Sequence, residues 1–345
     1  MMNKRKIIIN ALFFIAVFSV TYYYIFQNQD LSGIIDTIQD ANTGYWLAAV
    51  FCVVLFICSE SIIIFYMMRS IKQKVKLSHC ILYSFTGFFF SCITPSATGG
   101  QPAQVYFMKK DKIPISVSTL ILMIVTITYK MVLVLMGVIV LIFRPGKIIG
   151  FLEPAIGICY LGLLINVIFV GFMLLLMFHP TLAKNILTIL VELLVKLRLI
   201  RKKERYLAKI ESEMEQYKDV AYFFRTHKIV MGNVFILTVF QRMLLFYVTY
   251  LTYRSFGLRG TSFITIITLQ GMISVAVDML PLPGGMGISE KLFLAIFTPV
   301  FGSMTLPAMV VSRGLSFYTE LFLSAIFTIV AFLTIGRISE RKMKK

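Results

Sequence analysis

The sequence predicts an all-α integral membrane protein with about six full transmembrane helices and two opposed re-entrant hairpins in an inverted repeat. Composition is the first observation, because the 345-residue chain is 58% hydrophobic and only 14% charged, as in polytopic membrane proteins. The second is that six apolar runs are each long enough to cross about 30 Å of hydrocarbon. The third is that two further apolar stretches are broken by Pro and Gly.

Each of the six apolar runs is expected to form one membrane-spanning helix. The first follows Lys4, Arg5 and Lys6 and lacks a small-residue cleavage site, so we expect it to be an uncleaved signal anchor. The runs occupy residues 7–26, 46–68, 115–143, 154–178, 229–253 and 308–335.

The placement of the charges predicts the orientation. Basic clusters mark the cytoplasmic side of helical membrane proteins, and the loop 27–45 contains three Asp but no Lys or Arg. If 79–108 crossed the membrane, the basic segment 179–228 would lie outside. If 79–108 instead enters the membrane and returns to the cytoplasmic side, most of the 34 Lys and Arg residues lie in the cytoplasm. We therefore expect a multi-pass protein of the cytoplasmic (inner) membrane with both termini cytoplasmic.

The two broken stretches predict an internal repeat. "TPSATGGQPA" interrupts 79–108, and "LPLPGGMGISEK" interrupts 261–302, which would enter from the opposite side. The first repeat is 46–143 and the second 229–335, with Gly99-Gly100 and Gly284-Gly285 in corresponding places. Inverted repeats with paired Gly/Pro breaks indicate a midplane binding site and alternating access. The alternative is two unrelated Gly-rich bends that help packing.

The segment 180–228 is the longest non-membrane piece, and residues 1–345 otherwise form a single transmembrane domain. It is expected to contain an interfacial amphipathic helix, a polybasic patch of Arg201, Lys202, Lys203 and Arg205, and a solvated charged helix. Such a patch attracts anionic lipid headgroups. An equally good explanation of this basic segment is that its charges set the orientation of the protein in the membrane and belong to a solvated helix face.

Ionisable residues within the membrane are costly and usually face a cavity or a bundle interior. Three cations near the two breaks suit an anion, because Arg can grip a phosphate bidentately and Lys adds a point charge. The carboxylates would neutralise these cations, couple to protons or meet an amine of the substrate. The eight intramembrane charges are Glu60, Lys130, Arg242, Asp278, Glu290, Lys291, Arg313 and Glu320.

Internal pairing is the alternative explanation of these charges, for example Arg313 with Glu320 or with Asp278. We place Lys130, Arg242 and Arg313 on the phosphate. Asp278, Glu290 and Glu320 are expected to balance charge or to bind an amine. Lys130 and Arg313 follow the two Gly pairs at nearly the same distance, which supports a shared site.

Other classes of site find little support. The five Cys and three His residues show no metal-ligand spacing, and no P-loop, dinucleotide fingerprint or catalytic triad is visible. The net charge of +18 lies in loops between apolar runs, which argues against nucleic-acid binding. We expect no metal, no cofactor and no catalytic residue.

At "TPSATGGQPAQVYFMKKD" and "LPLPGGMGISEKLFL" the chain resembles the membrane region of the lysylphosphatidylglycerol synthase/flippase family, of the multiple peptide resistance factor type. In full-length members the membrane region is credited with moving lysyl-phosphatidylglycerol to the outer leaflet. A soluble domain makes that lipid from lysyl-tRNA. The resemblance covers essentially 1–345 and implies a short, flippase-like member without the synthase domain. The motif residues carried over are Pro95, Gly99, Gly100, Gln101, Pro102, Pro283, Gly284, Gly285, Gly287 and Glu290.

The predicted function is translocation of a phospholipid between leaflets of the cytoplasmic membrane, with lysyl-phosphatidylglycerol or a related phosphate-bearing lipid as substrate. The resemblance also implies a role in envelope charge and in resistance to cationic peptides, and a separate lipid-synthesising protein as a possible partner. Three alternatives stay open. They are a phosphatidylglycerol lysyltransferase acting alone or with a partner, a carrier of polyprenyl-phosphate lipids, and a non-transporting envelope interaction protein.

Overall fold

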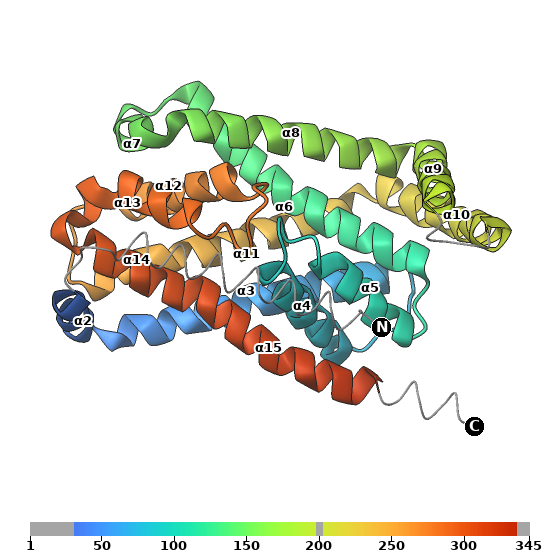
Figure 1. Ribbon diagram of the computed structural model, residues 1–345, viewed down its shortest axis with the longest axis horizontal. Helices are drawn as coiled ribbons and strands as arrows, with labels where there is room; N and C mark the ends of the chain where they lie inside the picture. Colours follow the sequence, from blue (N-terminus) through green and yellow to red (C-terminus); the bar gives the residue numbers. More distant parts are fainter. Residues whose placement is uncertain (1–30, 198–202, 337–345) are drawn as a thin grey trace.

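The computed structural model describes residues 31–197 and 203–336, and every regular element in these residues is a helix. Long helices run nearly parallel to the long axis of the molecule, and shorter helices meet between them (Figure 1). This architecture follows from the apolar sequence, because a chain in lipid must satisfy its backbone hydrogen bonds within each spanning segment. The prediction of an all-α membrane protein is confirmed.

Five of the six predicted spans lie in the described residues and are helical, and the first, 7–26, lies outside them. Helix α6 has the predicted bounds, and the other described spans differ from them by at most three residues at either end. The last span continues through two π-helical turns, Gly314–Tyr318 and Phe332–Gly336. The span helices are α3 (Thr43–Ser70), α6 (Ile115–Phe143), α8 (Ile156–Phe178), α11 (Lys228–Ser255), and α14 (Thr305–Arg313) with α15 (Thr319–Ala331).

Both broken stretches form helical hairpins. The first hairpin consists of α4 (Leu77–Cys92) and α5 (Gly100–Lys110), and the second of α12 (Phe263–Val277) and α13 (Ile288–Phe301). They point toward the middle of the molecule from opposite ends (Figure 1). Their tips touch there, because Pro95 and Pro283 form an isolated antiparallel bridge. Near it, Ser96 Oγ donates a hydrogen bond of 3.2 Å to the carbonyl of Leu280.

The two tips have the same left-handed backbone at the two residues that follow the bridged proline, which aligns the two repeats there. When Pro95 is matched with Pro283, Ser96 and Ala97 coincide with the next two residues of the second tip. Ser96 and Ala97 have φ of 48° and 54°, and Gly284 and Gly285 have φ of 56° and 67°. The predicted match of Gly99-Gly100 with Gly284-Gly285 was therefore wrong by three residues.

The basic loops gather at one end of the bundle, which we call the basic end. It carries the loop 71–76, α9 (Pro180–Lys196) and α10 (Lys203–Thr226). Helix α9 presents an apolar stripe outward, as expected for a helix at the membrane interface. The stripe contains Leu182, Ile186, Ile189, Leu190 and Leu193. The side chains of Arg201, Lys202, Lys203 and Arg205, the predicted polybasic patch, lie outside the described residues.

Helix α10 is not the solvated helix that its charges predicted. Its apolar face joins the protein core through buried Met214, Tyr217 and Phe224. Tyr217 also donates a 3.1 Å hydrogen bond to the carbonyl of Leu176 at the end of α8. Glu213 accepts a 3.0 Å bond from the backbone N–H of Ser116 in the first turn of α6. The many charged residues of α10 obscured the periodic apolar positions of this face in the sequence.

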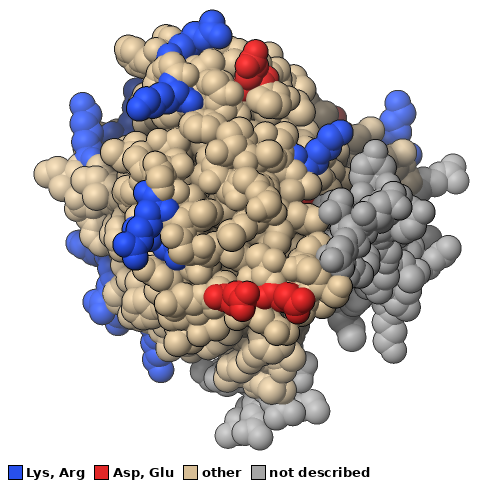
Figure 2. Space-filling model, turned by 90° about the vertical axis from the view of Figure 1, so that its left-hand side faces the viewer, with Lys and Arg blue, Asp and Glu red and all other residues tan. Residues whose placement is uncertain are grey.

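The opposite end carries two short helices that the sequence did not predict, α2 (Leu31–Gln39) and α7 (Gly146–Leu152). Much of this face is uncharged, and its Lys and Arg side chains lie mostly toward the edge (Figure 2). Asn42 joins this end of the bundle to the spans. Its side-chain oxygen accepts a hydrogen bond of 2.9 Å from the Gly44 N–H and so caps α3. The Asn42 N–H donates to the carbonyl of Ser255 at the end of α11 at 2.9 Å.

Candidate functional site

A cavity of about 620 Å³ lies beside the meeting point of the hairpin tips and is walled by spans of both repeats. It lies between the two breaks, where paired breaks of this kind are expected to form a binding site. Nine of the predicted site residues line it, namely Gln101, Pro102, Lys130, Arg242, Asp278, Gly284, Gly285, Arg313 and Glu320.

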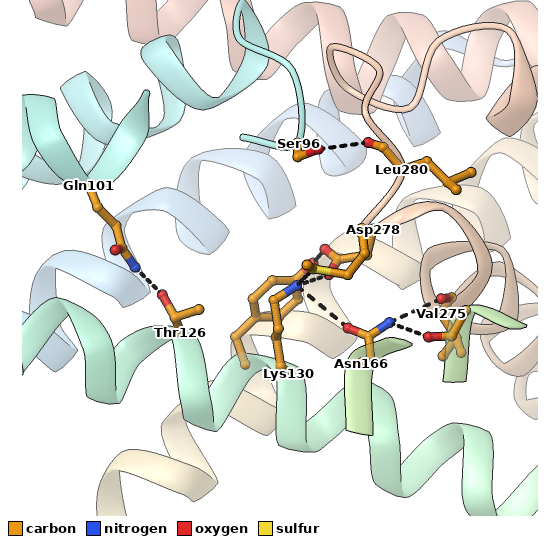
Figure 3. A network of polar contacts seen from close by, with 11 residues as sticks. Ser96, Gln101, Thr126, Lys130, Asn166, Val275, Asp278 and Leu280 are labelled. Atoms are coloured by element: carbon orange, nitrogen blue, oxygen red, sulfur yellow. Dashed lines mark hydrogen bonds and ion pairs between the residues drawn. The ribbon is translucent and has the colours of Figure 1, made fainter. Parts of the chain in front are cut away.

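The Lys130 ammonium is paired with a carboxylate from the opposite repeat. Both groups are largely buried, and Lys130 Nζ donates to Asp278 directly after α12 (Figure 3). The Tyr129 hydroxyl donates to the same carboxylate. A buried ion pair of this kind is stable only when further hydrogen bonds satisfy its remaining atoms. The pair therefore ties the tip of the second hairpin to α6.

Asn166 of α8 also belongs to this network of polar contacts around Lys130. Its amide nitrogen donates to the carbonyls of Gly162 at 2.9 Å and Val275 at 3.3 Å, so its side-chain oxygen faces Lys130 at 3.5 Å (Figure 3). Helices α8 and α12 touch here, because a Cβ at Gly162 would lie 2.3 Å from the Val275 carbonyl oxygen. Asn166 was not predicted, although it is the one Asn within the apolar run 154–178.

Arg313, at the end of α14, pairs with Glu290 in the first turn of α13 of the second hairpin. The distance from Arg313 Nε to Glu290 Oε1 is 2.7 Å, and a second guanidinium nitrogen donates to the Gly284 carbonyl at 3.1 Å. The other Glu290 oxygen accepts the Gly287 N–H at 2.6 Å, which caps the start of α13. The alternative of internal pairing thus holds for Arg313, but the expected partners Glu320 and Asp278 were wrong.

The π-helical turn Gly314–Tyr318 begins directly after Arg313. It places the Phe317 ring so close to Gly284 that a Cβ at this glycine would lie 2.1 Å from the ring. The Arg313 guanidinium carbon lies 4.6 Å from the centre of the same ring. Single π-helical turns occur often at functional sites because they re-aim side chains within a helix.

The Arg242 guanidinium has no carboxylate partner within salt-bridge distance among the described residues. It is buried, and its Nε atom has no hydrogen-bond partner. Aromatic rings hold it instead, with its guanidinium carbon 3.5 Å from the ring centre of Tyr129 and 5.0 Å from that of Phe56. The cavity therefore contains a buried positive group with an Nε–H donor that no described residue accepts.

Two carboxylates besides Asp278 line the same cavity. Glu60 accepts a hydrogen bond of 2.8 Å from Gln104 on α5, and Glu320 accepts one of 3.6 Å from the thiol of Cys92. Glu60 was recognised as an intramembrane charge but was not assigned to the site. Gln104 was missed as well, although it lies four residues after Gly100 in the first motif.

The remaining predicted residues shape the hairpins and do not line the cavity. They are Pro95, Gly99, Gly100, Pro283, Gly287 and Glu290. A Cβ at Gly100 would lie 2.1 Å from Ser91 Oγ and 2.7 Å from the Gly87 carbonyl oxygen, so this glycine lets α4 and α5 pack together. Gly287 has φ of 85°, which favours glycine. For these residues packing is the better explanation than substrate contact.

Gln101 of the first motif joins the hairpin to a second span, α6, as Gln104 joins it to α3. Its side-chain nitrogen donates to the Thr126 hydroxyl on α6 (Figure 3). The same helix carries Lys130, so α6 contacts both hairpins close to the cavity. Among the described residues no three His, Cys, Asp or Glu side chains are grouped so as to hold a metal ion.

Comparison with known families agrees with this architecture. The family model described as "Lysylphosphatidylglycerol synthase TM region" matches residues 7–324. The chain belongs to this family. No protein with a curated description matches the chain. The family match spans both hairpins and all cavity-lining residues, and with the five apolar spans it shows a multi-pass membrane protein of a lipid-associated family.

Proposed function

We propose that this protein translocates a phospholipid, lysyl-phosphatidylglycerol or a related phosphate-bearing lipid, between the leaflets of the cytoplasmic membrane. The observation that carries the proposal is the buried Arg242, which faces the cavity with its Nε unpartnered. Family membership supports a lipid of this class.

Of the three cations expected to hold the phosphate, two are already paired with carboxylates. Lys130 and Arg313 already hold Asp278 and Glu290, so they position the hairpin. Arg242 is then the group for the lipid phosphate, because guanidinium donors match phosphate geometry.

Glu60 and Glu320 would meet the amines of the lipid. In their ionised forms these two carboxylates and Arg242 together carry one negative charge. Lysyl-phosphatidylglycerol carries one phosphate and two amines, which gives it one net positive charge. A polyprenyl phosphate has no amine and would leave both carboxylates unmatched in a buried site, which is costly. The charges of the cavity therefore favour an amine-bearing phospholipid.

The repeat architecture supports alternating access. Each hairpin approaches the cavity from its own end, and the tips meet at Pro95 and Pro283. Small displacements of one repeat against the other would open the cavity to one leaflet at a time. The headgroup would cross through the cavity while the acyl chains stay in the bilayer. In this arrangement the basic end faces the cytoplasm, as the distribution of Lys and Arg predicts.

Proteoliposomes that contain lysyl-phosphatidylglycerol test this proposal. An impermeant amine-reactive dye labels the outer leaflet at once, and the inner pool reacts only as it is translocated. Wild type is expected to label the inner pool at least about tenfold faster than Arg242→Gln, since one charge-assisted contact of 1.5–3 kcal/mol is lost. Arg254→Gln, which changes an arginine at the end of the same helix, is the matched control.

The same vesicles separate the alternatives. Equal labelling with wild type and with empty vesicles would remove this lipid as the cargo, and a polyprenyl phosphate would be tried next. Formation of lysyl-phosphatidylglycerol from phosphatidylglycerol and lysyl-tRNA by the purified protein would instead establish a lysyltransferase. A non-transporting interaction protein would show neither reaction in any variant.

A further inference from the structure

A second pocket, of about 420 Å³, lies on the other side of α6 from the central cavity. Its walls come from α6, α8, the end of α10 and the start of α11. Most of the lining is apolar, including Ile124, Ile127, Met131, Leu174, Met177 and Met231. Methionine side chains adapt to flexible apolar ligands. The pocket shares no lining residue with the central cavity.

The charged side chains that line this second pocket are Arg225 and Lys228, and both are exposed. The Arg225 guanidinium carbon lies 5.8 Å from the ring centre of Phe178, which also lines the pocket. Among the described residues neither cation pairs with a carboxylate, and no Asp or Glu lines the pocket. A negatively charged group on an apolar tail would therefore complement it.

The location of this pocket agrees with such an occupant. It opens where α10 ends and α11 begins, at the basic end of the bundle. Lys228, in the first turn of α11, lines the pocket, and the N-terminal end of a helix favours a negative charge nearby. From Ile124 to Met131 the lining extends along α6 by about 10 Å, at 1.5 Å per residue. That length accommodates part of one acyl chain below the headgroup.

We propose that this pocket is a binding site for an anionic phospholipid, with the phosphate on Arg225 and Lys228 and one acyl chain against the methionines. Free phosphate would satisfy the two cations but would leave the apolar wall empty. The bound lipid would join the ends of α8 and α10 to the start of α11. This site is separate from the translocation cavity, and it does not depend on the proposed function.

Native mass spectrometry of the detergent-solubilised protein tests the site. The probes are dioleoyl phosphatidylglycerol, dioleoyl phosphatidylcholine and inorganic phosphate, each added alone. Wild type is expected to retain phosphatidylglycerol in preference to phosphatidylcholine and to retain no phosphate. Arg225→Gln with Lys228→Gln should weaken retention of phosphatidylglycerol about tenfold, since juxtamembrane cations supply the attraction for anionic lipid.

Two control variants keep this test specific. Lys74→Gln with Lys109→Gln removes two exposed basic side chains at the same end but outside the pocket. Met231→Trp fills the pocket, and Ile236→Trp adds the same bulk at an exposed position of the same helix. Retention should fall with Met231→Trp and stay unchanged with Ile236→Trp and with the lysine control pair.

Three outcomes would overturn the proposal. The first is equal retention of both lipids by wild type. The second is an equal loss with the Lys74 and Lys109 control pair, which would indicate diffuse surface charge. The third is full retention with Met231→Trp, which would leave the pocket without a role. Size-exclusion chromatography and circular dichroism confirm beforehand that each variant is folded.

Discussion

Pro95 and Pro283 lie opposite each other as an antiparallel bridge, so the tips of two hairpins from opposite ends of the molecule are in direct contact. Opposite residues of an antiparallel pair have Cα atoms about 4.5–5.5 Å apart, which is within the range that a disulfide spans. This contact gives the first prediction.

A disulfide between the tips should arrest translocation. Pro95→Cys with Pro283→Cys, in a background whose five native cysteines are replaced by alanine, is expected to lose inner-pool labelling when oxidised. Labelling should return after reduction, because alternating access requires the tips to separate. Each single-cysteine variant is the control. Unchanged labelling in the fully cross-linked protein would exclude movement of the tips from the transport cycle.

Gly284→Ala is expected to lower the thermal stability of the purified protein. Gly284 has φ of 56°, and an added Cβ would lie 2.1 Å from the Phe317 ring. The backbone strain alone costs roughly 1–3 kcal/mol. Thermal unfolding in detergent measures the change, and Phe317→Leu should recover part of the loss in the double variant.

Gly171→Ala is the matched control for that substitution. Gly171 lies in α8 with nothing within 4 Å of an added Cβ. An alanine there should leave stability unchanged or raise it slightly, since alanine favours helix. An equal fall in both variants would show that the effect comes from losing a glycine and not from the close approach of Phe317.

Asp278→Asn should destabilise the protein by about 3–5 kcal/mol, because it leaves the buried ammonium of Lys130 without its counter-charge. Lys130→Met combined with Asp278→Leu is expected to recover most of this loss, since a well-packed apolar pair replaces the ion pair. Thermal unfolding of wild type, Lys130→Met, Asp278→Leu and the double variant measures the coupling. Additive losses would show that the two groups do not stabilise each other.

Glu60→Gln and Glu320→Gln should change the preference for lipids with amines. Each carboxylate lines the cavity, and a glutamine keeps its size while removing its charge. Translocation of lysyl-phosphatidylglycerol is expected to fall about tenfold in each variant, because a charge-assisted contact to an amine is lost. Translocation of phosphatidylglycerol, which has no amine and is followed with an analogue carrying a fluorescent acyl chain that an impermeant reductant quenches in the outer leaflet, should fall much less.

Glu153→Gln controls for a general effect of removing a carboxylate, because Glu153 is exposed at the end of the bundle. Equal losses for both lipids in Glu60→Gln would mean that Glu60 acts through Gln104 on the fold and not through the lipid amine.

Long-range contacts decided much of the site. Hydropathy predicted Arg313 and Glu290 as intramembrane charges, but the partner of each depends on how α13 and α14 are rotated and how they pack. The positions of Glu60 and Asn166 in the site were likewise missed, because each enters it from a helix far away in sequence. Helix α10 was misread because its charge hid a face that packs against α6 and α9.

The sequence by itself determined the five spans that the structure describes, the two breaks, and seven of the eight charges withdrawn from solvent; the eighth, Lys291, is exposed, so the expectation that it faces a cavity or the bundle interior was wrong. These follow from local physics, since each segment must satisfy its own backbone in lipid and each break needs residues that tolerate a turn. Only the tertiary structure decided the register of the tips at Pro95 and Pro283, the pairing of Lys130 and Arg313, and the isolation of Arg242. The reason is that a charge selects its partner by distance in space, which the packing of the helices sets.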